Sequence, residues 1–210
     1  MTAQIYAIRH GETEWNSLGR QQGHLDSPLT PNGVRQANLL AGGLLPKRIE
    51  ILYSSDLGRA LQTAEIIAKT LSLNVCTDSR LRERHLGILQ GLTMQQFEEL
   101  YPAEYELFSS NDPDYILPGG ESARQCFERC VAYAEGLATE NNGKNILIVG
   151  HGGVLKSFFH KTIGTSLRMP RRFSLFNGSI NSFRVSNGHW MLDTWGEIAH
   201  LHNGQALDDF

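Results

Sequence analysis

The stretch QIYAIRHGETEWN, residues 4–16, joins a strand-like run to an unusual polar end. Residues 4–8 are mostly apolar and predict a short buried strand. Arg9 and His10 follow this strand directly, and Gly11 places a flexible joint after them. In open α/β sheets, ligands gather in the crevice at the carboxyl ends of the parallel strands. Two basic side chains at such a point therefore predict a site for an anion.

Strand-like and helix-like segments alternate through most of the chain. Short apolar runs predict further strands at residues 50–54, 74–77 and 145–149. Apolar residues repeating about every 3.6 positions predict helices at residues 30–45, 56–72, 121–138 and 153–164. Asp56 is the expected N-cap of the second of these helices. The alternation predicts an α/β fold, built from parallel βα units with right-handed crossovers around a mostly parallel sheet.

The C-terminal part of this pattern changes to consecutive strands. Strands are predicted at residues 173–177, 179–186 and 189–195, and the last two are joined by Asn187-Gly188, a strong hairpin signal. Residues 88–120 fit no strand and contain short helical pieces with several aromatic side chains. We expect one domain spanning residues 1–210, with residues 88–120 forming a lid-like insertion over one edge of the sheet.

Composition narrows the classes of function. The net charge is −3, and the calculated isoelectric point near 6.2 gives no electrostatic signature of a nucleic-acid partner. No apolar run approaches the roughly 20 residues that cross a bilayer, and the N-terminus does not resemble a secretory signal. Cys126 and Cys130 lie four apart in a helical pattern, which favours buried free thiols. We expect a cytoplasmic protein with neither a nucleic-acid nor a membrane partner, either a monomer or a homodimer.

Basic residues follow three different predicted strands. Arg9 and His10 follow the first, Arg59 lies in the first turn of the helix after the second, and His151 follows the strand at 145–149. Glycines after the strands, Gly152 among them, let the backbone approach a bound group. Taken singly, each histidine would more often be a hydrogen-bonded structural residue, and Arg59 a surface cation. Their convergence on one edge of the sheet instead predicts a pocket for a dianion such as phosphate.

Other phosphate and metal chemistries fit the sequence poorly. GHGGVLKS, residues 150–157, resembles a nucleotide-binding loop, but Leu155 stands where that loop needs glycine. CTDSRLR, residues 76–82, has the Cys-x5-Arg spacing of cysteine phosphatases without a glycine to shape a phosphate nest. No metal-ligand pattern is present, so we expect no metal and no cofactor. A histidine nucleophile remains, with arginines to neutralise the phosphoryl oxygens.

A leaving alkoxide needs a proton, and Glu83 in LRERHLG, residues 81–87, can supply it. Glu83 lies just beyond the strand predicted at 74–77, close to the same edge of the sheet. The alternative is a structural ion pair between Glu83 and a neighbouring arginine, Arg82 or Arg84. The spacing alone leaves both interpretations open.

Five motifs resemble those of one known family. They are RHGETEWN (9–16), QQGHLDSPLTPNG (21–33), SSDLGRALQTAE (54–65), LRERHLGILQG (81–91) and GHGG (150–153), in that order along the chain. This pattern is similar to the histidine phosphatase, or phosphoglycerate-mutase-like, superfamily. The resemblance implies a three-layer α/β/α fold and metal-independent catalysis through phosphohistidine.

The resemblance also implies roles for residues. It makes His10 the nucleophile and Glu83 the proton donor. The remaining residues that it implies to be catalytic or to bind the substrate are Arg9, Asn16, Gln22, Gly23, Arg59, His151 and Gly152. Asn16, Gln22 and Gly23 are implied by the resemblance alone.

This family contains both phosphatases and cofactor-dependent mutases. Residues 83–92, ERHLGILQGL, are close to the sequence of this motif in mutases, whereas Gly153 stands where mutases usually carry asparagine. The short tail after the last predicted strand ends in acidic residues, including Asp208 and Asp209, which would repel a phosphorylated ligand. We therefore expect a phosphatase acting on a small phosphorylated metabolite. A mutase is the alternative, and a non-catalytic phospho-ligand binding module is a third interpretation.

Overall fold

A mixed sheet of six strands lies at the centre of the computed structural model, which describes residues 2–201. The strands are β1 (Ala3–Arg9), β2 (Ile51–Ser54), β3 (Val75–Thr77), β4 (Asn145–Gly150), β5 (Ile180–Ser186) and β6 (His189–Glu197), in the spatial order β3-β2-β4-β1-β5-β6. The first four run parallel, and β5 and β6 add an antiparallel hairpin beside β1. The mostly parallel sheet is therefore confirmed. So is the turn at Asn187-Gly188, where both residues have positive φ, 48° and 74°.

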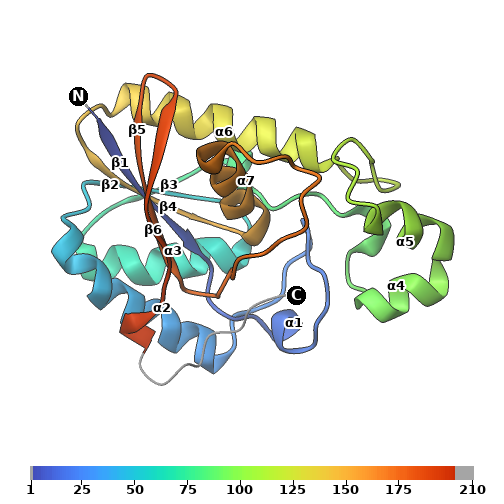
Figure 1. Cartoon of the computed structure of the whole chain (residues 1–210). Helices are drawn as coiled ribbons and strands as arrows, with labels where there is room; N and C mark the ends of the chain where they lie inside the picture. The colour runs from blue at the N-terminus through green and yellow to red at the C-terminus, as the bar shows by residue number, and fades with distance from the viewer. Residues whose placement is uncertain (1, 202–210) are drawn as a thin grey trace.

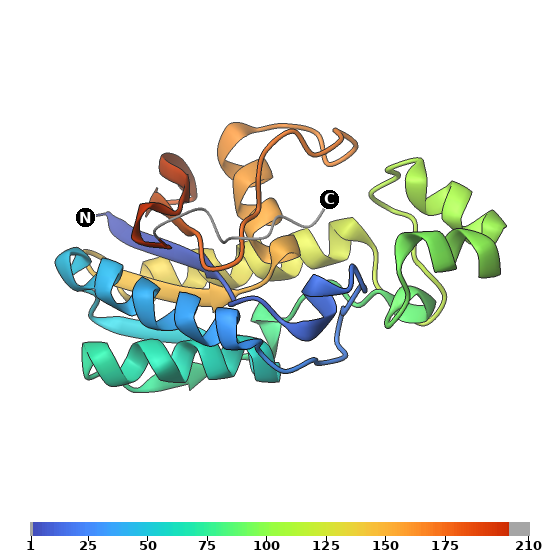
Figure 2. The same cartoon turned by 90° about the horizontal axis from the view of Figure 1, so that it is seen from below.

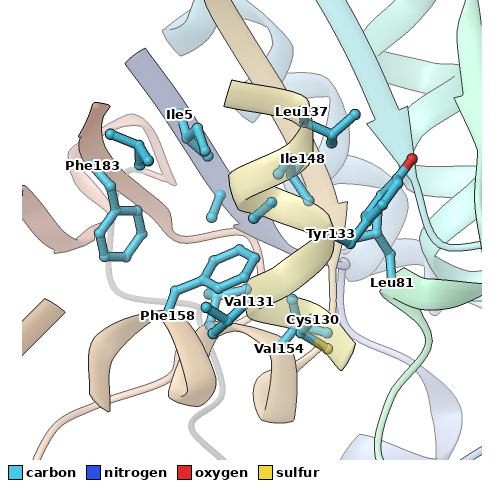
Figure 3. Close-up of a cluster of buried hydrophobic side chains, with 14 of the residues drawn as sticks. Ile5, Leu81, Cys130, Val131, Tyr133, Leu137, Ile148, Val154, Phe158 and Phe183 are labelled. Carbon is cyan, nitrogen blue, oxygen red and sulfur yellow. The ribbon is translucent and has the colours of Figure 1, made fainter. Parts of the chain in front are cut away.

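Helices cover both faces of the sheet and make three layers (Figure 1). The long helices are α2 (Pro31–Leu44), α3 (Gly58–Leu71), α6 (Ala123–Glu140) and α7 (Gly152–Ile163). Alternate residues of β4 separate the two cores, as the two-residue period of a strand requires. Ile146 and Ile148 pack with α6 and α7, whereas Leu147 and Val149 pack with α2 and α3. Figure 3 shows the first of these clusters, with Ile148 close to Leu137 of α6.

Shorter elements complete the chain. They are α1 (Glu14–Ser17), α4 (Met94–Leu100), α5 (Pro102–Ser109) and the 3₁₀ turns Leu45–Lys47, Ser79–Leu81, Gly87–Leu89 and Ala199–Leu201. No helix within residues 2–201 is both long and apolar enough to cross a membrane.

The cap of α3 differs from the one that we expected. The helix begins at Gly58, and its N-cap residue, Leu57, offers no side-chain hydrogen bond. Asp56 instead forms an ion pair with Arg82, with Nη2 and Oδ2 2.6 Å apart. Asp26, from a loop remote in sequence, accepts hydrogen bonds from the backbone N–H of Gly58 at 2.6 Å and of Arg59 at 3.3 Å. The unpaired N–H groups of the first turn are thus satisfied by a distant carboxylate.

Residues 173–177, predicted as a strand, form an irregular loop, so that prediction is wrong. The hairpin of β5 and β6 occupies the position next to β1, and this segment takes no place in the sheet. Polar groups of this loop form hydrogen bonds that are not part of the strand pairing of the sheet. The carbonyl of Ser174 accepts from Trp195 Nε1 at 3.0 Å, and Asn177 Nδ2 donates to the carbonyl of His10 at 3.0 Å.

The segment 88–120 carries α4 and α5 and lies beyond the carboxyl ends of the strands (Figure 2). Leu89, Phe97 and Leu117 of this segment form a small buried apolar cluster with Leu86, which comes just before it. The buried residues of this cluster are distinct from those of the two cores beside the sheet. The expected short helical pieces are therefore present, and they pack on one another.

Candidate active site

A cavity of about 270 Å³ opens at the carboxyl ends of the parallel strands. Five cationic side chains and one carboxylate contribute to its wall, which makes it a strongly basic space. The structure brings together almost all of the residues predicted from the sequence. Those that line the cavity are Arg9, His10, Asn16, Gln22, Gly23, Arg59, Glu83 and Gly152. His151 lies behind this wall, with its ring edge-on to that of His10 and the centroids 5.3 Å apart.

His10 follows β1 and is held in one tautomer. Its Nδ1 lies 2.8 Å from the carbonyl oxygen of Gly11, which can only accept, so Nδ1 carries the proton. Nε2 then has a free lone pair, and Arg59 Nε donates to it at 3.2 Å. Burial lowers the pKa of His10 well below its usual value, and the charges of Arg59 and Arg9 lower it further. His10 is therefore a neutral imidazole whose basic nitrogen faces the cations.

Arg59 is buried and bound on every side in the first turn of α3. Nη2 donates to the carbonyl of Gly23 at 2.9 Å, and Nη1 to the carbonyl of Leu25 and to Asp26 Oδ1, both at 2.9 Å. Burial lowers the pKa of Arg59, but a guanidinium stays charged in proteins. Gly23 has a φ of +55°, a conformation that glycine adopts readily. This turn directs its carbonyl at the guanidinium.

Arg9 is the last residue of β1, and only 3% of its surface is exposed. Its Nη1 donates to the carbonyl of Leu175. The irregular loop at 173–177 thus fixes one guanidinium and, through Asn177, the backbone of His10. Asn177 was not predicted from the sequence. Its part in the site is to hold the backbone of His10, and this contact is visible only in the structure.

His151 is fully buried just before α7. Burial lowers its pKa well below the usual value, and Arg59, His10 and Arg9 add to this shift. Neither ring nitrogen has a hydrogen-bond partner among residues 2–201. A neutral imidazole has one N–H, so His151 keeps a donor beside His10 that can bind an oxygen.

Glu83 is fixed by the backbone rather than by an arginine. Its carboxylate accepts from Arg84 N at 2.7 Å and from Gly153 N at 3.0 Å. Arg82 pairs with Asp56, and the guanidinium of Arg84 donates to carbonyl oxygens. Among the described residues, no ion pair joins Glu83 to either neighbour, so the salt-bridge alternative is not what the structure shows.

Gln22 and Asn16 lie at the rim. Gln22 Nε2 donates to Thr13 Oγ1 at 2.9 Å, while its buried Oε1 has no hydrogen-bond partner within residues 2–201. Asn16 completes a capping box with Thr13 at the start of α1. Both amides are thus oriented by the same threonine.

Four further polar or charged residues line the cavity to which sequence reasoning gave no part in the site: Arg20, Gln21, Arg84 and Lys156. Lys156 lies one turn after Gly152 on α7, so helical periodicity could have placed it at the same edge. Residues 88–120, with their aromatic side chains, are expected from the sequence to form a lid-like insertion. None of them lines the cavity, and Phe108 acts only through Arg84, whose Cζ lies 5.5 Å from its ring centroid. In the described part of the chain, no cluster of three His, Cys, Asp or Glu could hold a metal ion.

The chain belongs to the histidine phosphatase superfamily (branch 1), whose sequence profile matches residues 5–198. The family expected from the motifs and its three-layer fold are thereby confirmed.

Similar proteins are named either as phosphatases or as phosphoglycerate mutase-like proteins. Over 203 residues the chain is 40% identical to phosphoglycerate mutase-like protein 4 of Arabidopsis thaliana, covering 95% of this chain and 87% of that protein. It is 38% identical to a metal-independent phosphoserine phosphatase of the same plant, over 94% of this chain and 83% of that protein. A solved phosphoserine phosphatase of Entamoeba histolytica, in complex with 3-phosphoglyceric acid, is 32% identical with a TM-score of 0.85, over 95% and 99% of the two chains. The relatives are thus phosphatases or mutase-like enzymes.

Proposed function

We propose that this protein hydrolyses phosphomonoesters of small metabolites through a phosphohistidine at His10. One observation carries the proposal: the neutral His10 lies in the wall of a cavity that two buried arginines also line, with the unsatisfied His151 directly behind it. A phosphoryl group seated there meets a nucleophile on one side and cations around its equatorial oxygens.

In the first step, Nε2 attacks phosphorus in line, the N–P bond forms and the bond to the leaving oxygen breaks. Glu83, across the cavity from β1, donates its proton to the leaving alkoxide. Arg9 and Arg59 hold the phosphoryl oxygens, and His151 supplies a further hydrogen bond. The imidazole of His10 keeps its Nδ1 proton, which the carbonyl of Gly11 stabilises as positive charge develops.

In the second step, water attacks phosphorus from the side that the alcohol has left. Glu83, now a carboxylate, takes a proton from this water, and the P–N bond breaks. Inorganic phosphate leaves, and His10 returns to its neutral form. Water is thus the final acceptor of the phosphoryl group.

Gly153 favours hydrolysis over the mutase alternative. A Cβ at this position would approach Glu83 Oε1 more closely than side-chain atoms can. The asparagine usual in mutases would therefore displace the carboxylate from the position where the Gly153 N–H holds it. The acidic tail that also favoured a phosphatase, with Asp208 and Asp209, lies outside the described residues.

Names of the relatives suggest which esters to assay first. Phosphoserine and 3-phosphoglycerate are the phosphorylated molecules that those names contain. We propose a small phosphorylated metabolite as the partner, with no metal, no nucleic acid, a monomeric or homodimeric state and a cytoplasmic location.

Rapid acid-free quenching with a ³²P-labelled ester tests the proposal. We expect a protein adduct that is stable to alkali and labile to acid, absent from His10→Ala and retained in Cys76→Ser, whose thiol is exposed. Binding without turnover would favour the binding-module interpretation. Turnover with an adduct in the His10→Ala variant would overturn the mechanism.

A further inference from the structure

Two of the cavity's cations also border a second, smaller space. Arg84, Gly153 and Lys156 line both the main cavity and a side pocket of about 70 Å³. The side pocket continues along α7 to His160. Since the two spaces share three wall residues, they lie next to each other, on the side of the cavity where Glu83 meets Gly153.

The positions of the two cations follow from their elements. Arg84 comes directly after Glu83, and its guanidinium donates to the carbonyls of Glu121 at 2.9 Å and Tyr115 at 3.3 Å. Lys156 lies three residues after Gly153 on α7, and therefore on the same face of that helix. Both side chains are partly buried. Glu83 thus stands between the phosphoryl-binding residues and this cationic pair.

The carboxylate of Glu83 acts on both cations through its charge but forms no ion pair with either in the described part of the chain. Within residues 2–201, neither Arg84 nor Lys156 forms an ion pair with a carboxylate, and the ammonium of Lys156 makes no hydrogen bond. Burial lowers the pKa of Lys156, and the nearby charge of Arg84 lowers it further. Partly buried like charges are costly unless an anion joins them.

The buried side chain of His160 also favours an oxygen ligand in the side pocket. His160 is 3% exposed and lines the side pocket, where its Nε2 has no hydrogen-bond partner among the described residues. Its Nδ1 is already engaged by Thr165 Oγ1 at 2.8 Å. The side pocket therefore combines cations with an unsatisfied buried nitrogen, which can donate to an oxygen ligand when Thr165 Oγ1 donates to Nδ1 and Nε2 carries the proton.

We propose that Arg84 and Lys156 form a subsite for a carboxylate carried by the leaving group of the substrate. The inference rests on the proposed function, because Glu83 places the leaving oxygen beside this pair. The side pocket, of about 70 Å³, has room for a carboxylate. The preferred esters thus carry a carboxylate a few bonds from the phosphate. The subsite would favour these esters over small phosphorylated metabolites that lack a carboxylate.

Matched substrates test the subsite. O-phosphoserine and O-phosphoethanolamine differ only in the carboxylate, and 3-phosphoglycerate and glycerol 3-phosphate differ by a carboxylate against a hydroxymethyl group. We expect Lys156→Met to raise KM for the carboxylated member of each pair roughly tenfold to a hundredfold, as for lost charge-assisted hydrogen bonds. The other members should change by less than about twofold, and Lys156→Arg should retain the preference.

Lys161→Met is the control on the same helix, because Lys161 pairs with Glu135 at 2.9 Å, away from the cavity. Equal losses for both members of a pair would overturn the subsite while leaving the hydrolase intact. A loss confined to a substrate with a second phosphate would overturn its assignment to carboxylates. If no ester is hydrolysed, the proposed function fails, and calorimetric titration still tests the subsite: O-phosphoserine must bind more tightly than O-phosphoethanolamine, and only in proteins that keep the charge at position 156.

Discussion

Arg59 donates its Nε proton to Nε2 of His10 across 3.2 Å. The nitrogen proposed as nucleophile is therefore already aligned with a cation before any ligand arrives. The two other nitrogens of Arg59 are held by Gly23, Leu25 and Asp26, which fixes the guanidinium beside His10. The hydrogen bond holds the lone pair of the neutral imidazole, so it must break when Nε2 attacks phosphorus, while the carbonyl of Gly11 keeps the ring oriented through Nδ1.

Glu83→Gln separates proton donation from phosphate binding. A glutamine side chain cannot protonate the leaving oxygen, so alkyl phosphates should slow by about 10²–10⁴-fold. p-Nitrophenyl phosphate should lose much less, because its phenolate departs without strong protonation. Steady-state kcat for both esters measures the difference. Equal losses would mean that Glu83 serves the structure of the site rather than the proton transfer.

Stability at mildly acid pH should depend on His10. Its pKa is depressed in the folded protein from the usual 6.5, so below that pH the unfolded chain binds a proton that the folded chain refuses. Unfolding free energy must then fall as the pH drops from about 6.5 toward 5. His10→Gln should reduce the slope by up to about 1.4 kcal/mol per pH unit. Urea denaturation across this range tests it.

The matched control is His189→Gln, at an exposed position of β6. A slope that is the same in the His10→Gln variant as in the parent protein would contradict a buried, neutral His10.

Asp26→Ala should destabilise α3 and disturb Arg59 together. Loss of the remote cap is expected to cost about 1–2 kcal/mol, in the range of N-cap replacements. Arg59 also loses its carboxylate partner, so kcat/KM should fall with the stability. Asp56→Ala removes only the partly exposed pair with Arg82 and should cost less than about 1 kcal/mol. A reversed order of the two losses in thermal unfolding would show that Asp26 is not the effective cap.

Gly153→Asn tests the choice between hydrolysis and mutase chemistry. The parent protein, given 3-phosphoglycerate with catalytic 2,3-bisphosphoglycerate, should form little 2-phosphoglycerate while releasing phosphate from at least some monoesters. The variant should release phosphate more slowly, because the new Cβ displaces Glu83. Gly153→Ala controls for the Cβ alone. Rapid 2-phosphoglycerate formation by the parent with negligible phosphate release would make the mutase interpretation correct.

Exhaustive chelation should leave the phosphatase rate unchanged. Arg9 and Arg59 supply the positive charge that a divalent ion would otherwise bring to the phosphoryl oxygens. Rates before and after treatment with EDTA, with each divalent ion then added back, measure this. Recovery with a single ion after loss would falsify metal independence.

Local patterns in the sequence predicted the parallel strands, the main helices and the convergence of Arg9, His10, Arg59 and His151 on one edge. These features depend on short periodicities and on where a strand ends. Asp26 as the cap of α3 could not be predicted, because it lies 32 positions before Gly58 and only tertiary packing joins them. The loop at 173–177 is rich in apolar residues like a strand, yet the sequence does not specify whether a neighbouring strand pairs with it.

The order of the strands also bears on when this site can exist during synthesis. β4 is made after β1, β2 and β3, yet it lies between β1 and β2 and pairs with both. A nascent chain that has not yet released residues 145–150 has no bridge between the strand that carries Arg9 and the β2–α3 unit that carries Arg59. The cationic cradle therefore assembles late and all at once, when the ribosome has already delivered most of the polypeptide.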